Sequence, residues 1–253
     1  MLISFHEVPG NPSPVAPPPA LPLPAVLGVL ALRPVLLAVS WLVLLLAVGA
    51  AALPGALLWQ NVVIVAVDLV SIAVVVALLH RHGRRARDLI ALRASDWWRA
   101  PLTFLIVMVG FVAASYVGNL VAYAGPPPAD TEGGFTVPLW LGVWSLALMP
   151  LTIGVAEELV YRGIGQGELT RRWGRWAGWL VAAAFFGVQH FFLTPPDPQA
   201  WLARFVTTFL AGLLFGALYW WHRRLAPLII AHVLLDVVGL GLPMLYVALA
   251  AGA

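Results

Sequence analysis

The 253-residue chain has no cysteine, no lysine and little charge of either sign. Without cysteine it forms no disulfide, no zinc–thiolate site and no thiol nucleophile. Soluble domains carry about 25% charged residues. This chain has 10%, while 62% of its residues are hydrophobic and its mean hydropathy is +0.93. So few charges cannot cover a surface that faces water, which excludes a solitary soluble domain and a disordered chain.

Residues 1–24 differ in composition from the rest of the chain. The stretch NPSPVAPPPALPLP is rich in proline and lacks periodicity, which is typical of an extended or disordered tail. No basic segment precedes a short apolar core, so we do not expect a cleaved signal peptide. We predict a disordered cytoplasmic tail over 1–24.

Seven apolar runs follow, each of 18 to 23 residues and therefore long enough to span a bilayer as a helix. They are 35–53, 62–79, 102–124, 139–156, 176–193, 202–221 and 225–242. Residues 243–253 are too few to span alone, and we expect a half-helix or the far side of a kink at Pro243. The fold class is therefore an all-α polytopic integral membrane protein with about seven to eight transmembrane helices. The N-terminal transmembrane helices lie within residues 25–135.

The 14 basic residues, all arginine, gather in alternate loops. Most lie in 81–99, in 171–175 and in 223–224, Arg33 precedes the first run, and the intervening loops have none. By the positive-inside rule the N-terminus is cytoplasmic. Arg204 is the exception, close to an outer helix end where a long side chain can reach the interface. The net charge of +3 thus comes from arginines that indicate membrane topology, and we predict no nucleic-acid partner.

Ionisable residues inside membrane helices are costly and are functional candidates by default. In this chain they are Asp68, Glu157, Glu158, Arg162, His190, His232 and Asp236. All but Asp68, whose role the sequence leaves open, lie in the C-terminal half.

The segment Glu157-Glu158-Leu-Val-Tyr-Arg162 carries the most information. Glu158 and Arg162 are four residues apart and share a helix face, so we expect them to pair. Glu157 points about 100° away, which leaves it free to face another helix. In the simpler interpretation, both glutamates only neutralise Arg162 near the interface.

Counting inward from the tryptophan belts places mid-membrane near 149–154, 188–190 and 235–236, with Glu157 somewhat to the cytoplasmic side of His190 and His232, within the range that helix tilt covers. One carboxylate and two histidines then converge on a polar cavity. The set suits activation of water by a glutamate–histidine pair, and it also suits a divalent metal bound by two histidines and a glutamate. Spacing does not separate these two interpretations.

The ordered motifs Glu157-Glu158-x-x-x-Arg162, Phe186-x-x-x-His190 and His232-x-x-x-Asp236 resemble those of the CPBP intramembrane proteases. This family, also called Abi, contains the relatives of the CAAX prenyl protease Rce1. The resemblance covers roughly 139–240 and implies an Rce1-like helical bundle with a catalytic membrane core in 136–253. The motifs of zinc, rhomboid-like serine and presenilin-like aspartyl membrane proteases do not occur.

The resemblance implies a role for each motif residue. Glu157 would activate water together with His190, and His232 with Asp236 would stabilise the oxyanion, while Glu158, Arg162 and Phe186 would support the site. The family often has Asn at the position of Asp236. An ionised Asp cannot donate to an oxyanion, so Asp236 either is protonated by burial or orients His232.

The family is described as metalloproteases, yet these roles favour a metal-free mechanism, and we expect no cofactor. Zinc at Glu157, His190 and His232 is the alternative. The predicted function is an endopeptidase of a bacterial cell membrane, acting on membrane-associated peptides or proteins, lipidated or not. CAAX processing does not follow, because bacterial-type members often cut other peptides or serve in bacteriocin immunity. The alternatives are a non-catalytic immunity or interaction protein and a small proton-coupled transporter.

Overall fold

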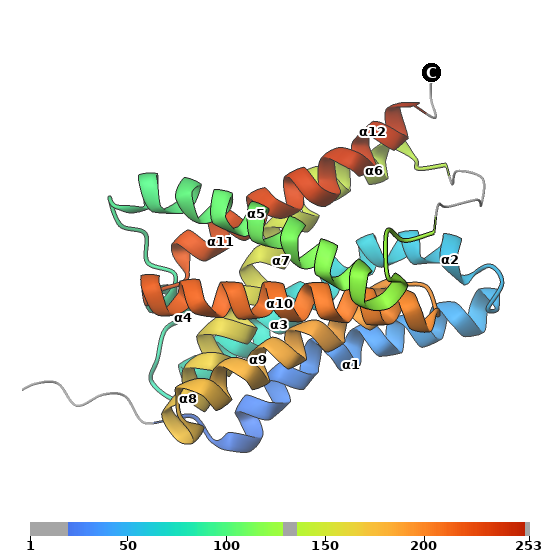
Figure 1. Ribbon diagram of the computed structural model, residues 1–253. Helices are drawn as coiled ribbons and strands as arrows, with labels where there is room; N and C mark the ends of the chain where they lie inside the picture. The colour runs from blue at the N-terminus through green and yellow to red at the C-terminus, as the bar shows by residue number, and fades with distance from the viewer. Residues whose placement is uncertain (1–19, 129–135, 251–253) are drawn as a thin grey trace, which may run out of the picture.

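The computed structural model describes residues 20–128 and 136–250, and within these ranges every regular element is a helix (Figure 1). The N-terminal part contains α1 (Leu23–Val48), α2 (Leu53–Ala56), the 3₁₀-helix η1 (Leu57–Trp59), α3 (Gln60–Arg81), α4 (Ala86–Leu89) and α5 (Asp96–Tyr123). The C-terminal part contains α6 (Leu139–Ala147), α7 (Met149–Glu157), the π-helix η2 (Glu158–Gln166), α8 (Gly167–Trp173), α9 (Arg175–Gln189), the 3₁₀-helix η3 (His190–Leu193), α10 (Pro198–His222), α11 (Ala226–Asp236), the π-helix η4 (Val237–Gly241) and α12 (Leu242–Ala250).

The described part of the chain has seven helical segments long and apolar enough to cross a bilayer. They are Leu23–Val48, Leu53–Arg81, Asp96–Tyr123, Leu139–Trp173, Arg175–Leu193, Pro198–His222 and Ala226–Ala250. The predicted all-α polytopic fold is confirmed.

The first span begins at Leu23, and the prediction that it starts at residue 35 is wrong. Arg33 and Pro34 lie inside α1 and are buried, so Arg33 is not a loop arginine that reports topology. A charge at this depth is tolerated when it is paired, and the partners of Arg33 come from distant helices. The helix also begins within the predicted tail 1–24, of which residues 1–19 lie outside the described ranges.

The last span runs from Ala226 to Ala250, so residues 243–250 extend the seventh crossing. The π-helical turn Val237–Gly241 comes just before Pro243. Proline has no N–H and its ring crowds the preceding turn, and a wide π-turn is one way for a helix to absorb such a defect. The continuity of this span gives seven crossings in the described part of the chain.

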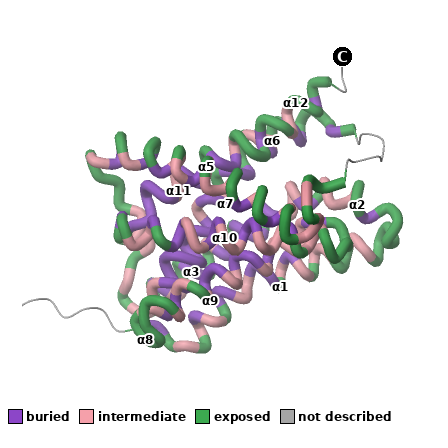
Figure 2. The backbone as a smooth tube through the Cα atoms, in the orientation of Figure 1, coloured by how far each residue is buried: buried purple, intermediate pink, exposed green. Residues whose placement is uncertain are grey.

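The helices pack around α10, which contacts α5 and α9, while α3 packs against α1 and α7. Buried residues concentrate in the middle of the bundle, along α3, α7 and α10 (Figure 2). Large apolar side chains on the outer faces are exposed, such as Val39 (54%) and Val109 (71%). These outer faces have the composition of surfaces that contact lipid.

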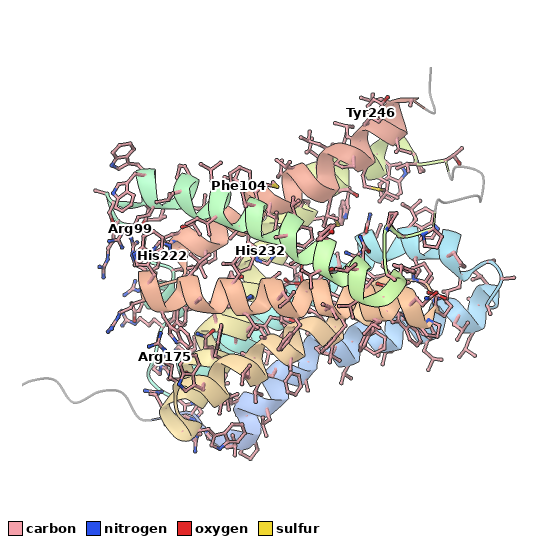
Figure 3. The ribbon with its side chains drawn as sticks, viewed as in Figure 1. Arg99, Phe104, Arg175, His222, His232 and Tyr246 are labelled. Atoms are coloured by element: carbon pink, nitrogen blue, oxygen red, sulfur yellow. The ribbon has the colours of Figure 1, made fainter. Side chains whose placement is uncertain are left out.

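The arginine-bearing loops share one end of the bundle. Arg99 and Arg175 lie at this end, Tyr246 lies at the other, and His232 lies between the two ends (Figure 3). We call the first the arginine end and the other, with α2 and the loop after η3, the opposite end. Ion pairs between Glu168 and Arg84 and between Asp96 and Arg224 hold segments together at the arginine end.

Candidate active site

The helix changes its geometry at the pair of glutamates. The α-helix α7 ends at Glu157, and the π-helix η2 begins at Glu158. Arg162 Nη1 donates to Glu158 Oε1 at 3.1 Å, the pairing that the spacing predicts, and both side chains are buried. π-Helical segments often occur at functional sites, and this nine-residue one begins at the junction of the two adjacent carboxylates.

Two aromatic rings enclose the Arg162 guanidinium. Its central carbon lies 4.4 Å from the centroid of Phe186 and 4.9 Å from that of Phe215. Cation–π contacts strengthen when they are removed from water, and Phe186 also makes an edge-on contact with Tyr161. Phe186 therefore supports the arginine that supports Glu158.

Glu157 turns away from Arg162 and binds a cation from α1. Arg33 Nη2 donates to Glu157 Oε1 at 2.8 Å, and Gln189 Nε2 donates to the same oxygen at 2.9 Å. Arg33 also donates to Gln189 Oε1 at 2.9 Å and forms an ion pair with Asp68 of α3. Tyr161 donates to Gln189 at 2.9 Å. One oxygen of Glu157 is thus held by two donors.

Sequence reasoning missed Arg33 and Gln189 and left Asp68 without a role. Gln189 precedes a motif histidine and carries no charge, so nothing distinguished it. For Arg33 the signal in the sequence was Asp68, because a single carboxylate inside the second apolar run needs a cationic partner at the same depth. Arg33 is the arginine closest to the N-terminus, next to an apolar run.

His232 lies between the two glutamates. Its Nδ1 is 2.9 Å from Glu158 Oε1, and because a carboxylate only accepts, Nδ1 carries the proton. Its Nε2 lies 3.5 Å from Glu157 Oε2 and 3.9 Å from Asp236 Oδ2. The distance to Asp236 is too long for a hydrogen bond, so Glu158, and not Asp236, orients the His232 ring.

His190 and Asp236 complete the set. His190 Nδ1 donates to the carbonyl oxygen of Phe186 at 2.7 Å, which leaves Nε2 as an acceptor. Asp236 is buried, and its Oδ2 has no hydrogen-bond partner in the described part of the chain. Such an atom is costly to bury, and Asp68 Oδ2 and Glu158 Oε2 share this condition in the described residues.

Glu157, His190, His232 and Asp236 all line one cavity of about 520 Å³. Much of its remaining wall is apolar and includes Ile64, Phe111, Met149, Ile153, Leu235 and Met244. The lining also includes Pro54, Gly55 and Pro195 at the opposite end, and no described residue of 81–99 or 168–175. The cavity therefore runs from the polar cluster toward the opposite end of the bundle.

The same residues were tested as a metal site. Across residues 20–128 and 136–250, no group of three or more His, Cys, Asp or Glu side chains is arranged to hold a metal ion. Both Nδ1 atoms carry hydrogen bonds, to Phe186 and to Glu158, which leaves the Nε2 atom of each histidine directed elsewhere.

Residues 138–238 match the family model described as Type II CAAX prenyl endopeptidase Rce1-like. Over this segment the chain is similar to the Rce1-like CAAX proteases. The matched segment contains the paired glutamates, Arg162, Phe186, both histidines and Asp236, whereas Arg33 and Asp68 precede it. No curated protein and no solved structure matches the chain.

Proposed function

We propose that this protein is an integral membrane endopeptidase that hydrolyses a peptide bond of a membrane-associated peptide or protein with water activated by Glu157 and His190. One observation carries the proposal. Glu157 is held through Oε1 by Arg33 and Gln189 and presents Oε2 toward His232, in a cavity that His190 also lines. A general base needs this combination of fixed position and free oxygen.

The reaction follows from these positions. A water held between Glu157 Oε2 and His190 Nε2 gives its proton to Glu157 while its oxygen attacks the carbonyl carbon of the peptide bond. The tetrahedral intermediate collapses when Glu157 passes that proton to the leaving amine nitrogen. One water is consumed, and one carboxyl end and one amino end are formed.

Two groups face the developing oxyanion. Protonated on both nitrogens, His232 donates to Glu158 through Nδ1 and to the oxyanion through Nε2. We assign Asp236 as a protonated second donor, because its Oδ2 is unpartnered and the ring of His232 is already oriented by Glu158. Donors fixed before the reaction account for a large part of the stabilisation of such intermediates.

The test compares the membrane proteomes of cells that produce wild-type protein with those that produce Glu157→Gln. The substitution removes the base and keeps the shape, so peptides that end at new cleavage sites should disappear while the variant stays folded. The matched control is Asp88→Asn, an exposed carboxylate at the arginine end, which should leave the cleavage pattern unchanged. Identical peptides from wild-type and Glu157→Gln cells would favour the non-catalytic immunity or interaction protein.

A further inference from the structure

Arg204 of α10 is half-buried and lines the cavity. Within residues 20–128 and 136–250 it has neither an ion pair nor a side-chain hydrogen bond. The buried arginines Arg33 and Arg162 each bind a carboxylate. His190 lines the same cavity. The cavity thus contains the proposed catalytic cluster, and Arg204 lies in its wall without an ion pair in the described residues.

An unpaired cation is expensive in an apolar surrounding. The sequence places Arg204 close to an outer helix end, and the structure shows it in the wall of the cavity and of a smaller neighbouring cavity lined by Ser115, Asn119 and Tyr123. The planar fork of a guanidinium matches a carboxylate in particular. A ligand that brings a carboxylate into this cavity would remove the cost of the unpaired charge.

The rise of helix α10 gives the distance between Arg204 and the ring of His232, the proposed oxyanion donor. Arg204, Thr208, Ala211 and Phe215 recur every three or four positions and all line the cavity, so they share one face. The Phe215 ring lies 4.7 Å from the ring of His232. At 1.5 Å per residue the 11 steps from Arg204 to Phe215 cover about 16 Å, which an extended peptide spans with roughly four to five residues.

We propose that Arg204 binds a carboxylate of the substrate, located roughly four to five residues from the cleaved bond. The carboxylate is either the free C-terminus of the peptide or an Asp or Glu side chain. The inference rests on the proposed peptidase function, because the distance is counted from His232, the proposed oxyanion donor. It makes Arg204 a determinant of which peptides are cut.

The experiment uses purified full-length protein in vesicles of zwitterionic lipid and four matched sets of apolar decapeptides. Two sets end in a free carboxylate or an amide, and two amidated sets carry Asp or Asn at each position in turn. Mass spectrometry gives the relative kcat/KM and the cut position in each set. The variants are Arg204→Gln, Arg204→Lys and the control Arg85→Gln, an exposed arginine at the arginine end.

Wild-type protein and the control should prefer carboxylate over amide, or Asp over Asn, by roughly 10- to 100-fold, the range for a hydrogen-bonded charge. In Arg204→Gln the ratio should fall to about one, and Arg204→Lys, which keeps the charge without the fork, should lie between. The set that shows the preference identifies the source of the carboxylate. A ratio that is unchanged in Arg204→Gln would overturn the proposal.

The experiment also distinguishes binding of a lipid phosphate by Arg204 from a failure of the proposed peptidase function. If the sets are cut equally and Arg204→Gln only alters the effect of adding phosphatidylglycerol, the anion is a lipid phosphate and the substrate proposal fails. If no set is cut, the proposed function fails on these peptides, and binding decides the inference. Fluorescent acid and amide peptides are then titrated against Glu157→Gln protein with and without Arg204→Gln, and equal affinities in both would refute it.

Discussion

Arg33 joins a helix outside the family match to Glu157, the proposed general base, and its removal tests the whole arrangement. In Arg33→Met the buried carboxylates of Asp68 and Glu157 lose their shared cation. Breaking a buried pair by removing one partner costs about 3–5 kcal/mol. For a chain of this size each kcal/mol lowers the melting temperature by about 2–4 °C, so we expect a decrease of roughly 6–20 °C in detergent.

The companion variants separate stability from positioning. In Asp68→Asn one carboxylate is neutralised while Arg33 still holds Glu157, so the protein should keep most of its activity. The double variant Arg33→Met/Asp68→Asn has one unpaired carboxylate fewer than Arg33→Met and should recover part of the melting temperature. Its kcat should remain low with KM little changed, because Glu157 still lacks its anchor.

The assay pairs thermal melts with peptide cleavage for the four proteins. Recovery of stability without recovery of kcat is the signature of a positioning residue. A double variant that regains both would show that Arg33 only balances charge. An Arg33→Met protein with wild-type melting temperature and activity would refute the buried network altogether.

Four other predictions follow from the site and the fold. Glu158→Gln should lower the melting temperature and the yield, because it strands Arg162 at a cost of about 3–5 kcal/mol, and thermal melts check this. Asp236→Asn keeps a donor and should retain most activity, whereas Asp236→Ala should lose on the order of 10²–10³ in rate; a folded but inactive Asn variant would eliminate the donor role. Single cysteines at Gly55 and Asp88 should react differently with an impermeant thiol reagent on intact cells, with Gly55→Cys labelled and Asp88→Cys protected, since the positive-inside rule places the arginine end in the cytoplasm. A strong chelator should leave peptide cleavage by purified protein unchanged, and inactivation reversed by zinc would contradict the metal-free reaction.

The helical membrane fold could be predicted because lipid imposes it. Apolar runs of sufficient length must be helices in a bilayer, and each of the seven runs lies largely within a span of the structure. The first run was misplaced by 12 residues at its start, because Arg33 and Pro34 suggested a loop. The error came from treating a charge as a boundary when its partners, Asp68 and Glu157, were far away in sequence.

The motif residues could be named from sequence, but their hydrogen bonds could not. The pair of Glu158 and Arg162 follows from helix spacing alone. The contact between His232 and Glu158 joins two helices and depends on how η2 widens after Glu157. Spacing within one helix instead suggested that Asp236 orients His232, although their atoms lie 3.9 Å apart. Local periodicity gives contacts within a helix, and only packing gives those between helices.

Charge balance in the buried cluster connects these assignments. Asp68, Glu157 and Glu158 contribute three negative charges, while Arg33, Arg162 and a doubly protonated His232 contribute three positive ones. Among these groups, which are joined by ion pairs and from which Arg204 stands apart, the sum is zero when Asp236 is a neutral acid, the form that donates to an oxyanion. A neutral cluster is also the cheapest to keep within an apolar bundle. Replacement of Asp236 by Asn preserves this balance, whereas an Asp236 anion would leave the cluster with one excess negative charge beside Glu157, the proposed base.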